Sequence, residues 1–237
     1  MRPAAAPATL DPVSDPKSAQ HWTRALAGRF VAFEGPDGSG KSTQYRRFIA
    51  LCENFGITTC EVREPGGTPI GESIREILLH TKSEMTLRCE MLLYMASRAQ
   101  LVEQRIRPAL ARGELVIADR FVTSTLVYQG AAGGLPIDDI RAVASVALQD
   151  AFPDLVLIFD VDEDTAAARI NPLLATATRK DGLDRIESRG REFHRKVRQG
   201  YLDLAKAEPD RHLVIDATRT VDEVWSDLTH RLAQRFE

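Results

Sequence analysis

A glycine-rich run near the start of the chain carries residue types suited to chemistry on phosphates. It fits the pattern G-x-x-x-x-G-K-S/T, whose glycines let backbone N–H groups close around a polyanion. Lys41 in this pattern can reach the β- and γ-phosphates, and the Ser42 hydroxyl can hold Mg²⁺. An apolar, strand-like stretch precedes the run and a helical pattern follows it, so the helix dipole also favours an anion here. The predicted phosphate-binding residues are Gly35, Pro36, Asp37, Gly38, Ser39, Gly40, Lys41, Ser42 and Thr43.

Arginines recur at the expected ends of strands and starts of helices, namely Arg63, Arg75, Arg98 and Arg120. A guanidinium fork matches two phosphate oxygens in bidentate geometry. Each arginine alone is more typical of a surface salt bridge. An enzyme that joins two phosphate-bearing molecules, however, must offset the repulsion between them. We therefore predict that these arginines converge on a second phosphate group.

Two aspartates are candidates for the acidic partner of magnesium. Asp119 and Asp160 each end an apolar, strand-like run. Because both positions suit a carboxylate that binds Mg²⁺ with the phosphates, the residues alone leave the choice open. We prefer Asp119 because Arg120 directly follows it.

Short apolar runs alternate with helical patterns along the chain. The expected strands are residues 29–34, 57–63, 115–118, 155–160 and 212–215. The expected helices are one that follows the glycine-rich run and residues 84–111, 136–150, 163–170, 191–208 and 221–236. Continuous apolar runs suit strands buried on both faces, and the alternation implies a parallel sheet with helices on both sides. We predict an α/β fold with a five-stranded parallel sheet, whose ligands bind beyond the carboxyl ends of the strands.

Bulk properties bound the partners and the compartment. The chain has 237 residues and a formal net charge of -3, which argues against non-specific nucleic-acid binding. Its three cysteines are scattered, which indicates reduced thiols in a cytoplasmic protein. No apolar run has the length of a membrane span, so we expect no membrane partner. We expect residues 1–27 to be a mostly disordered extension, with a short helix around residues 22–26, and residues 28–237 to form one domain.

One charged stretch, residues 171–190, breaks the regular alternation. It contains Pro172, Gly182 and Gly190. Charged segments of this kind are commonly solvated surface loops. Beside a phosphate site, the same composition also fits a lid that closes over a transferring group. Its basic candidates are Arg179, Lys180, Arg185 and Arg189.

An ordered set of motifs makes the chain resemble a known family. The set is Phe33-Glu34-Gly35, Arg63-Glu64-Pro65-Gly66-Gly67-Thr68, Asp119-Arg120-Phe121 with Ser124 and Tyr128-Gln129-Gly130, Leu183-Asp184-Arg185-Ile186-Glu187, and Tyr201-Leu202. From about residue 30 to its end, the chain resembles the thymidylate kinases of the P-loop nucleoside monophosphate kinase group. The resemblance implies this fold type with a short lid. It also implies phosphorylation of dTMP to dTDP by Mg-ATP, in dTTP biosynthesis.

The resemblance implies how the acceptor phosphate and sugar are held. Asp37 would accept a hydrogen bond from the deoxyribose 3′-hydroxyl. Arg63, Arg75 and Arg120 would surround the dTMP phosphate. The ring of Tyr128 would pack under the sugar and leave little space for a ribose 2′-hydroxyl.

The resemblance also implies how the base is read. Tyr94 would stack on thymine, although its neighbours Leu92 and Met95 also fit a helix core. Arg98 lies one helical turn after Tyr94 and would bond the base edge, while Gln129 would line the base pocket. The residues implied for dTMP are Asp37, Arg63, Pro65, Arg75, Tyr94, Arg98, Arg120, Ser124, Tyr128 and Gln129.

For the reacting end, the resemblance implies that Glu34 and Asp119 act through magnesium-bound water, beside Ser42 as a magnesium ligand. The glycine-rich loop has no basic residue between Gly35 and Gly40, so the chain resembles the arrangement whose basic residue lies in the lid. Residues 170–181 look longer than the family's compact lid. Either Arg179 or Lys180 therefore fits the role of the basic lid residue, with Arg185 close behind. The implied catalytic residues are Lys41, Arg120, Arg179, Lys180 and Arg185.

Two other functions fit parts of the pattern. A deoxynucleoside kinase would phosphorylate a sugar hydroxyl, and would want a carboxylate base because a hydroxyl is a poor nucleophile. A nucleotide-dependent switch would bind partners without phosphotransfer, and a guanine-specific one usually carries an N-K-x-D motif, which this sequence lacks. The family resemblance also implies a homodimer.

Overall fold

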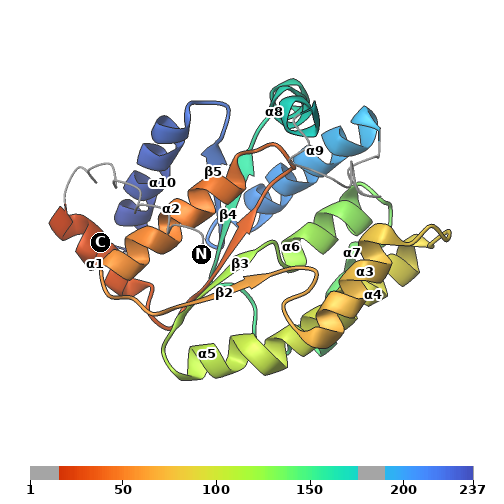
Figure 1. Ribbon diagram of the computed structural model, residues 1–237, viewed down its shortest axis with the longest axis horizontal. Helices are drawn as coiled ribbons and strands as arrows, with labels where there is room; N and C mark the ends of the chain where they lie inside the picture. The colour runs from red at the N-terminus through yellow and green to blue at the C-terminus, as the bar shows by residue number, and fades with distance from the viewer. Residues whose placement is uncertain (1–15, 176–189, 237) are drawn as a thin grey trace, which may run out of the picture.

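The centre of the molecule is a five-stranded sheet in which all neighbouring strands are parallel, which confirms the predicted fold class. The computed structural model describes residues 16–175 and 190–236. The strands lie in the order β2-β3-β1-β4-β5, and Figure 1 shows helices on both sides of them. They are β1 (Phe30–Glu34), β2 (Thr59–Arg63), β3 (Leu115–Asp119), β4 (Leu155–Asp160) and β5 (His212–Asp216).

Helices connect the strands on both faces of the sheet. Two stretches, η1 and η2, are π-helical. The helices are α1 (Pro16–Ala25), α2 (Lys41–Asn54), α3 (Pro69–His80), α4 (Leu87–Leu101), η1 (Val102–Ile106), α5 (Arg107–Ala111), α6 (Val122–Thr125), η2 (Leu126–Ala131), α7 (Ile137–Leu148), α8 (Glu163–Ala175), α9 (Arg191–Ala207) and α10 (Val221–Phe236).

Two apolar clusters pack on the two faces of the sheet. Successive side chains of a strand point to opposite faces. Phe30 and Ala32 of β1 therefore belong to the cluster shared with α4, α7 and α9. Val31 and Phe33 belong to the cluster shared with α1, α2 and α10. Strand β1 is buried on both faces, so polar residues can lie only at its ends. Its carboxyl end is followed by the glycine-rich loop.

The predicted helix 84–111 is one helical run with an irregular middle. It begins at Leu87, where the Thr86 side chain accepts a hydrogen bond from the backbone N–H of Cys89. The π-helical η1 interrupts it just before Pro108. Proline lacks a backbone N–H and crowds the preceding turn, which accounts for the local widening. Helices α3 and α6 and the segment η2 have no counterpart in the elements predicted from the sequence.

The expectation of a mostly disordered extension is wrong for residues 16–25, which form α1. Trp22 is 1% exposed and stacks on Phe48 of α2, with 6.4 Å between ring centroids. Ala19 and Leu26 are buried in the same cluster. The amphipathic spacing of these apolar residues stabilises the helix, and α1 lies beside α10 in Figure 1. Residues 1–15 lie outside the described residues.

The predicted helix 163–170 continues to Ala175 as α8, so the start of the predicted lid, residues 171–175, is helical. The remaining lid candidates, Arg179, Lys180, Arg185 and Arg189, lie outside the described residues. Within residues 16–175 and 190–236, no helix combines the length and apolarity that crossing a membrane requires.

Candidate active site

The glycine-rich loop joins β1 to α2, and left-handed glycines shape it. Gly38 and Gly40 have φ of 79° and 78°, a region that suits glycine because it lacks a Cβ. A Cβ on Gly38 would lie 2.5 Å from the carbonyl oxygen of Ala166, so the loop packs directly on α8. Gly40 is the N-cap of α2 and directs the positive end of that helix into the loop. The backbone therefore has the form that binding a phosphate chain requires.

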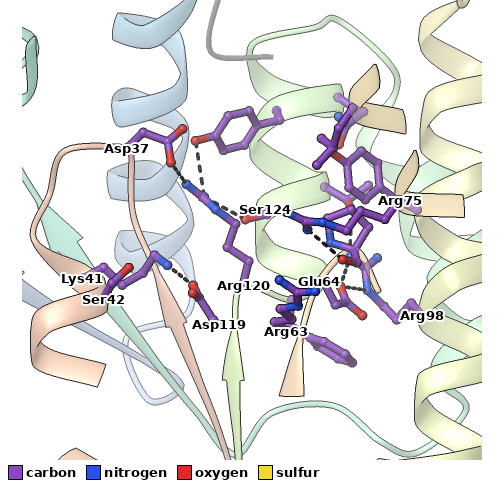
Figure 2. Close-up of a pocket in the computed structure, with 17 residues that line it drawn as sticks. Asp37, Lys41, Ser42, Arg63, Glu64, Arg75, Arg98, Asp119, Arg120 and Ser124 are labelled. Atoms are coloured by element: carbon purple, nitrogen blue, oxygen red, sulfur yellow. Dashed lines mark hydrogen bonds and ion pairs between the residues drawn. The ribbon is translucent and has the colours of Figure 1, made fainter. Parts of the chain in front are cut away.

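Lys41, the first residue of α2, reaches across to β3. Its ammonium group pairs with the carboxylate of Asp119, as Figure 2 shows. Burial, together with the nearby guanidinium of Arg120, lowers the pKa of Lys41 to about 7. Burial destabilises the charged form of Lys41. A bound polyanion would stabilise the ammonium again, because its negative charge attracts the positive one.

Ser42 and Asp119 offer oxygen atoms to one side of a shared pocket. Mg²⁺ prefers oxygen ligands and is commonly bound by one or two protein groups together with substrate phosphates. Among the described residues, no cluster of three or more His, Cys, Asp or Glu side chains is placed to hold a metal alone. The donor set therefore fits a magnesium ion that shares its coordination with bound phosphates.

A pocket of about 300 Å³ lies next to this loop, beyond the carboxyl ends of β1, β2 and β3. Every residue that the resemblance assigns to dTMP lines it. Lys41, Ser42 and Asp119 line it too, so the predicted donor and acceptor groups share one cavity. Its lining residues in the described chain are Asp37, Lys41, Ser42, Arg63, Glu64, Pro65, Arg75, Leu79, Tyr94, Arg98, Asp119, Arg120, Phe121, Ser124, Thr125, Tyr128 and Gln129.

Arg120 occupies the centre of the pocket wall, directly after β3. Its φ is 66°, in the left-handed region that residues with a side chain rarely adopt. Its guanidinium donates to the carboxylate of Asp37 at 2.7 Å and to the Tyr128 hydroxyl at 3.4 Å (Figure 2). The Asp37 carboxylate, expected at the sugar hydroxyl, thus also orients the arginine. Backbone strain at such a position is typical of residues held for function.

Glu34 lies behind the pocket wall, and its placement differs from the predicted role at magnesium. It is fully buried and does not belong to the pocket lining among the described residues. Both carboxylate oxygens accept hydrogen bonds: from the backbone N–H of Phe121 at 2.8 Å, the Ser124 hydroxyl at 2.6 Å and the Tyr201 hydroxyl at 2.9 Å. Glu34 therefore holds the turn that follows Arg120, and its oxygens are committed to that task.

Arg98 and Glu64 form a buried ion pair at the other end of the pocket. Arg98 is 1% exposed, and its Nε and Nη2 approach Glu64 Oε2 at 2.7 Å and 2.5 Å (Figure 2). Its Nη2 also donates to the Thr125 hydroxyl at 3.2 Å. The second oxygen of Glu64 is buried without a hydrogen-bond partner among the described residues. Burial raises the pKa of the Glu64 carboxyl to about 7, although the charge of Arg98 opposes this shift.

Arg63 and Arg75 reach the pocket from β2 and α3. Arg75 donates to the carbonyl oxygen of Pro65 at 2.9 Å, and the largely exposed Arg63 lies 3.3 Å from Glu72. Glu72 also accepts from the backbone N–H of Gly67 at 2.8 Å, which ties the loop before α3 to the helix itself. The pairing of Arg63 with Glu72 is long and exposed, so this guanidinium is able to turn toward an anion, whereas Arg75 is held at the pocket by a partly buried hydrogen bond.

The sequence and the fold match those of known proteins. The thymidylate kinase family model matches residues 33–228. The chain is 45% identical to the thymidylate kinase of Symbiobacterium thermophilum over 200 residues, which is 84% of this chain and 90% of that protein. It is 43% identical to that of Deinococcus radiodurans over 208 residues, 88% of this chain and 98% of that protein. The crystal structure of thymidylate kinase from Ehrlichia chaffeensis superposes with a TM-score of 0.68 at 31% identity, over 86% of this chain and 97% of that one.

This chain belongs to the thymidylate kinase family. The matched range holds the glycine-rich loop and every lining residue of the pocket. Helix α1 precedes that range. The apolar face of α1 packs against α2 and α10, most of whose buried residues lie within the range that the family model matches.

Several polar residues of this thymidylate kinase site carry no role in the sequence-based prediction. Glu64 and Tyr201 belong to the sequence motifs without an assigned function, and Glu90 belongs to none of them. Glu90 is fully buried and accepts a hydrogen bond from Gln129 at 2.6 Å. A signal for it exists, because Glu90, Tyr94 and Arg98 are spaced four residues apart on α4 and so share one face of the helix.

Proposed function

We propose that this chain transfers the γ-phosphoryl group of Mg-ATP to dTMP, forming dTDP, in the biosynthesis of dTTP. The observation that carries the proposal is the composition of one cavity. The groups expected for the acceptor line it together with Lys41 and Ser42 of the phosphate loop. Membership of the thymidylate kinase family supports the same reaction.

The acceptor phosphate of dTMP is the nucleophile. A phosphate monoester has its second pKa near ~6, so it is largely a dianion at neutral pH and needs no general base. One of its oxygens bonds to the γ-phosphorus while the bond from that phosphorus to the β,γ-bridging oxygen breaks. The electron pair of the broken bond leaves on ADP. Catalysis then consists of alignment and of offsetting negative charge.

Positive charge acts at two places in this reaction, at the acceptor phosphate and at the phosphates of ATP. Arg63, Arg75 and Arg120 reduce the repulsion that the acceptor dianion meets on approach to ATP. Lys41 donates to the β- and γ-phosphates, and exchanges its contact with Asp119 for them in doing so. Ser42 and Asp119 would hold Mg²⁺, which when bound spreads the charge of the phosphate oxygens.

The remaining pocket residues fit a thymine nucleoside. Tyr94, half-buried on α4, stacks on the base. Arg98 donates to a carbonyl oxygen of the base from a position fixed by Glu64. Tyr128 is buried under the sugar, and its ring packs edge-on against Tyr201 with 6.4 Å between centroids.

We propose that a basic residue of the segment 176–189 completes the charge at the transferring group. The glycine-rich loop has no cation of its own between Gly35 and Gly40, which supports a donor from elsewhere. Arg179 and Lys180 are the first candidates and Arg185 the next. Separate Arg179→Ala and Lys180→Ala variants should differ in kcat, whereas equal, near-native rates in both would transfer the role to Arg185 or Arg189.

We further propose a homodimer that acts in the cytoplasm, as family membership suggests. The exposed Leu92 and Val146 side chains on the adjoining helices α4 and α7 support burial of this face by a second copy. Light scattering coupled to size-exclusion chromatography tests the assembly. A monomer at micromolar concentration would contradict it.

A phosphoryl-transfer assay across acceptors tests the function. The pure protein is incubated with Mg-ATP and dTMP, dUMP, AMP, CMP, GMP or thymidine, and ADP formation is followed. We expect dTMP to be the best of these acceptors. Faster transfer to AMP, CMP or GMP would refute the specificity, and activity on thymidine alone would indicate a deoxynucleoside kinase. Slow hydrolysis unaffected by any monophosphate would indicate a nucleotide-dependent switch.

A further inference from the structure

A buried carboxylate stands directly behind the base end of the pocket. Glu90 of α4 is fully buried and lies outside the pocket lining in the described chain. Its Oε1 accepts a hydrogen bond from Nε2 of Gln129 at 2.6 Å. Gln129 belongs to η2, is 2% exposed and does line the pocket. Two helical segments far apart in sequence are therefore joined at this point by one short hydrogen bond.

The chemistry of this contact fixes which way the Gln129 amide faces. The Glu90 oxygen accepts the hydrogen bond at this contact, whereas an amide has one donating and one accepting end. The nitrogen of the amide must face Glu90, because the reverse orientation would set two acceptors against each other. Such a mismatch inside a protein costs the desolvation energy of both groups. With the nitrogen held at Glu90, the carbonyl oxygen lies on the other side of the amide, and it is the one accepting atom that Gln129 can offer to the pocket beside its second N–H.

We propose that Glu90 is a positioning residue that makes Gln129 present an acceptor oxygen to the base, and so selects bases that carry a ring N–H. The proposal rests on the proposed function and names the source of its base selectivity. Thymine and uracil carry a hydrogen on N3 and complement the oxygen. Cytosine has a lone pair at N3 and meets it with repulsion.

The test compares two acceptors in the full-length enzyme. Glu90→Gln keeps the shape of the side chain but can face Gln129 with either a donor or an acceptor, which frees the amide of Gln129 to rotate. The ratio of kcat/KM for dTMP to that for dCMP should fall about tenfold or more, with dCMP turnover rising. The exposed Glu103, which forms a surface pair with Arg107, supplies the matched control Glu103→Gln, which should leave the ratio unchanged.

A second variant separates orientation from support of the fold. In a Gln129→Ala background, Glu90→Gln should no longer change the ratio, because the group through which Glu90 acts is gone. An unchanged ratio in Glu90→Gln alone would overturn the proposal. So would an equal loss for both acceptors, or a further change of the ratio in the Gln129→Ala background.

One measurement needs no folded variant of Glu90. The NMR signal of the Gln129 side-chain amide is assigned in ¹⁵N-labelled wild-type enzyme, because it is the signal lost in Gln129→Ala. One of its two protons should be shifted downfield and protected from exchange. Amide protons with the shifts and exchange of a solvated glutamine would overturn the proposal. A wild-type enzyme that transfers phosphate but not to dTMP would instead refute the proposed function, so the two failures are distinct results.

Discussion

Three cations of the pocket, all buried or partly buried, each have a carboxylate beside them. Lys41 pairs with Asp119, Arg98 with Glu64 and Arg120 with Asp37. Since an unpaired buried charge is costly, these carboxylates keep the cationic side chains folded inward and pre-aligned. In the proposed reaction Lys41 exchanges Asp119 for the phosphates, whereas Arg98 keeps Glu64 when it binds the base, so the cations need little rearrangement.

Lys41→Ala should abolish phosphoryl transfer while the fold is retained. The substitution removes the ammonium that reaches the β- and γ-phosphates, and leaves the carboxylate of Asp119 to repel the nucleotide. Steady-state rates with Mg-ATP and dTMP, with circular dichroism as the check on folding, measure this. Lys196→Ala, which removes an exposed lysine of α9, is the control and should be unaffected. Residual activity of a tenth or more would contradict the role of Lys41.

Glu64→Gln should change how stability depends on pH. The folded-state pKa of Glu64, about 7, lies above the ordinary value of 4.5. Between these values the folded chain keeps a proton that the unfolded chain has released, so this carboxyl lowers the free energy of unfolding as pH rises. The variant cannot titrate there, and its stability relative to wild type should improve from about pH 5 to about pH 7. Urea unfolding of both proteins at several pH values measures this. A difference in the free energy of unfolding between Glu64→Gln and wild type that does not change with pH would refute it.

Among the elements, the turn between β3 and α6 is held from both sides. Glu34 at the end of β1 binds the backbone N–H of Phe121 and the hydroxyl of Ser124. Tyr201 of α9 binds Glu34 at 2.9 Å and lies 3.4 Å from Arg120 Nη1. Strand, turn and helix thus share one buried network, which keeps Arg120 in its left-handed conformation.

Tyr201→Phe should lower kcat about tenfold with little change in the KM for ATP. The lost hydroxyl loosens the turn that carries Arg120, and a hydrogen bond to a charged group contributes about 1.5–3 kcal/mol. Tyr45→Phe is the matched control, because its hydroxyl binds only the backbone oxygen of Ile117 among the contacts described. The control should lose about 1 kcal/mol of stability and keep its kcat. Equal kcat in the two variants would show that the network does not position Arg120.

On the scale of the whole molecule, helix α1 precedes the residues that the family model matches and packs against the rest of the fold. It covers α2 and α10 on the face of the sheet opposite to α4 and α7 (Figure 1). Trp22 packs on Phe48, which in turn tilts against Phe33 of β1 with 5.3 Å between centroids. The strand that leads into the phosphate loop is thereby supported from the N-terminal segment.

Trp22→Ala should destabilise the enzyme without impairing the chemistry of the folded fraction. Removing a fully buried tryptophan typically costs about 3–5 kcal/mol through lost burial and the cavity left behind. Urea unfolding gives the free energy, and kcat is measured below the transition. His21→Ala, at the exposed neighbouring position, should cost little. A loss below about 1 kcal/mol for Trp22→Ala would mean that α1 is not part of the cooperative core.

Local sequence determined the sheet and the phosphate loop of this protein. Apolar runs such as residues 30–34 and 155–160 are strands because their side chains must be buried on both faces. The glycine spacing around Lys41 sets the loop, because left-handed backbone there suits residues without a Cβ. The motifs also named every residue expected at dTMP, and the structure brings these residues to one cavity.

Tertiary structure alone decided what each polar group faces. The family resemblance implies that Glu34 acts through magnesium-bound water, and the fold adds that its oxygens bind Phe121, Ser124 and Tyr201, which lie far along the chain. Trp22 lies in an Ala- and Pro-rich segment that resembles an extension, and it is buried because it stacks on Phe48 of α2 within a cluster that distant helices complete. Local propensity and spacing describe a residue's own element, whereas burial and hydrogen-bond partners depend on which other elements the fold packs against it.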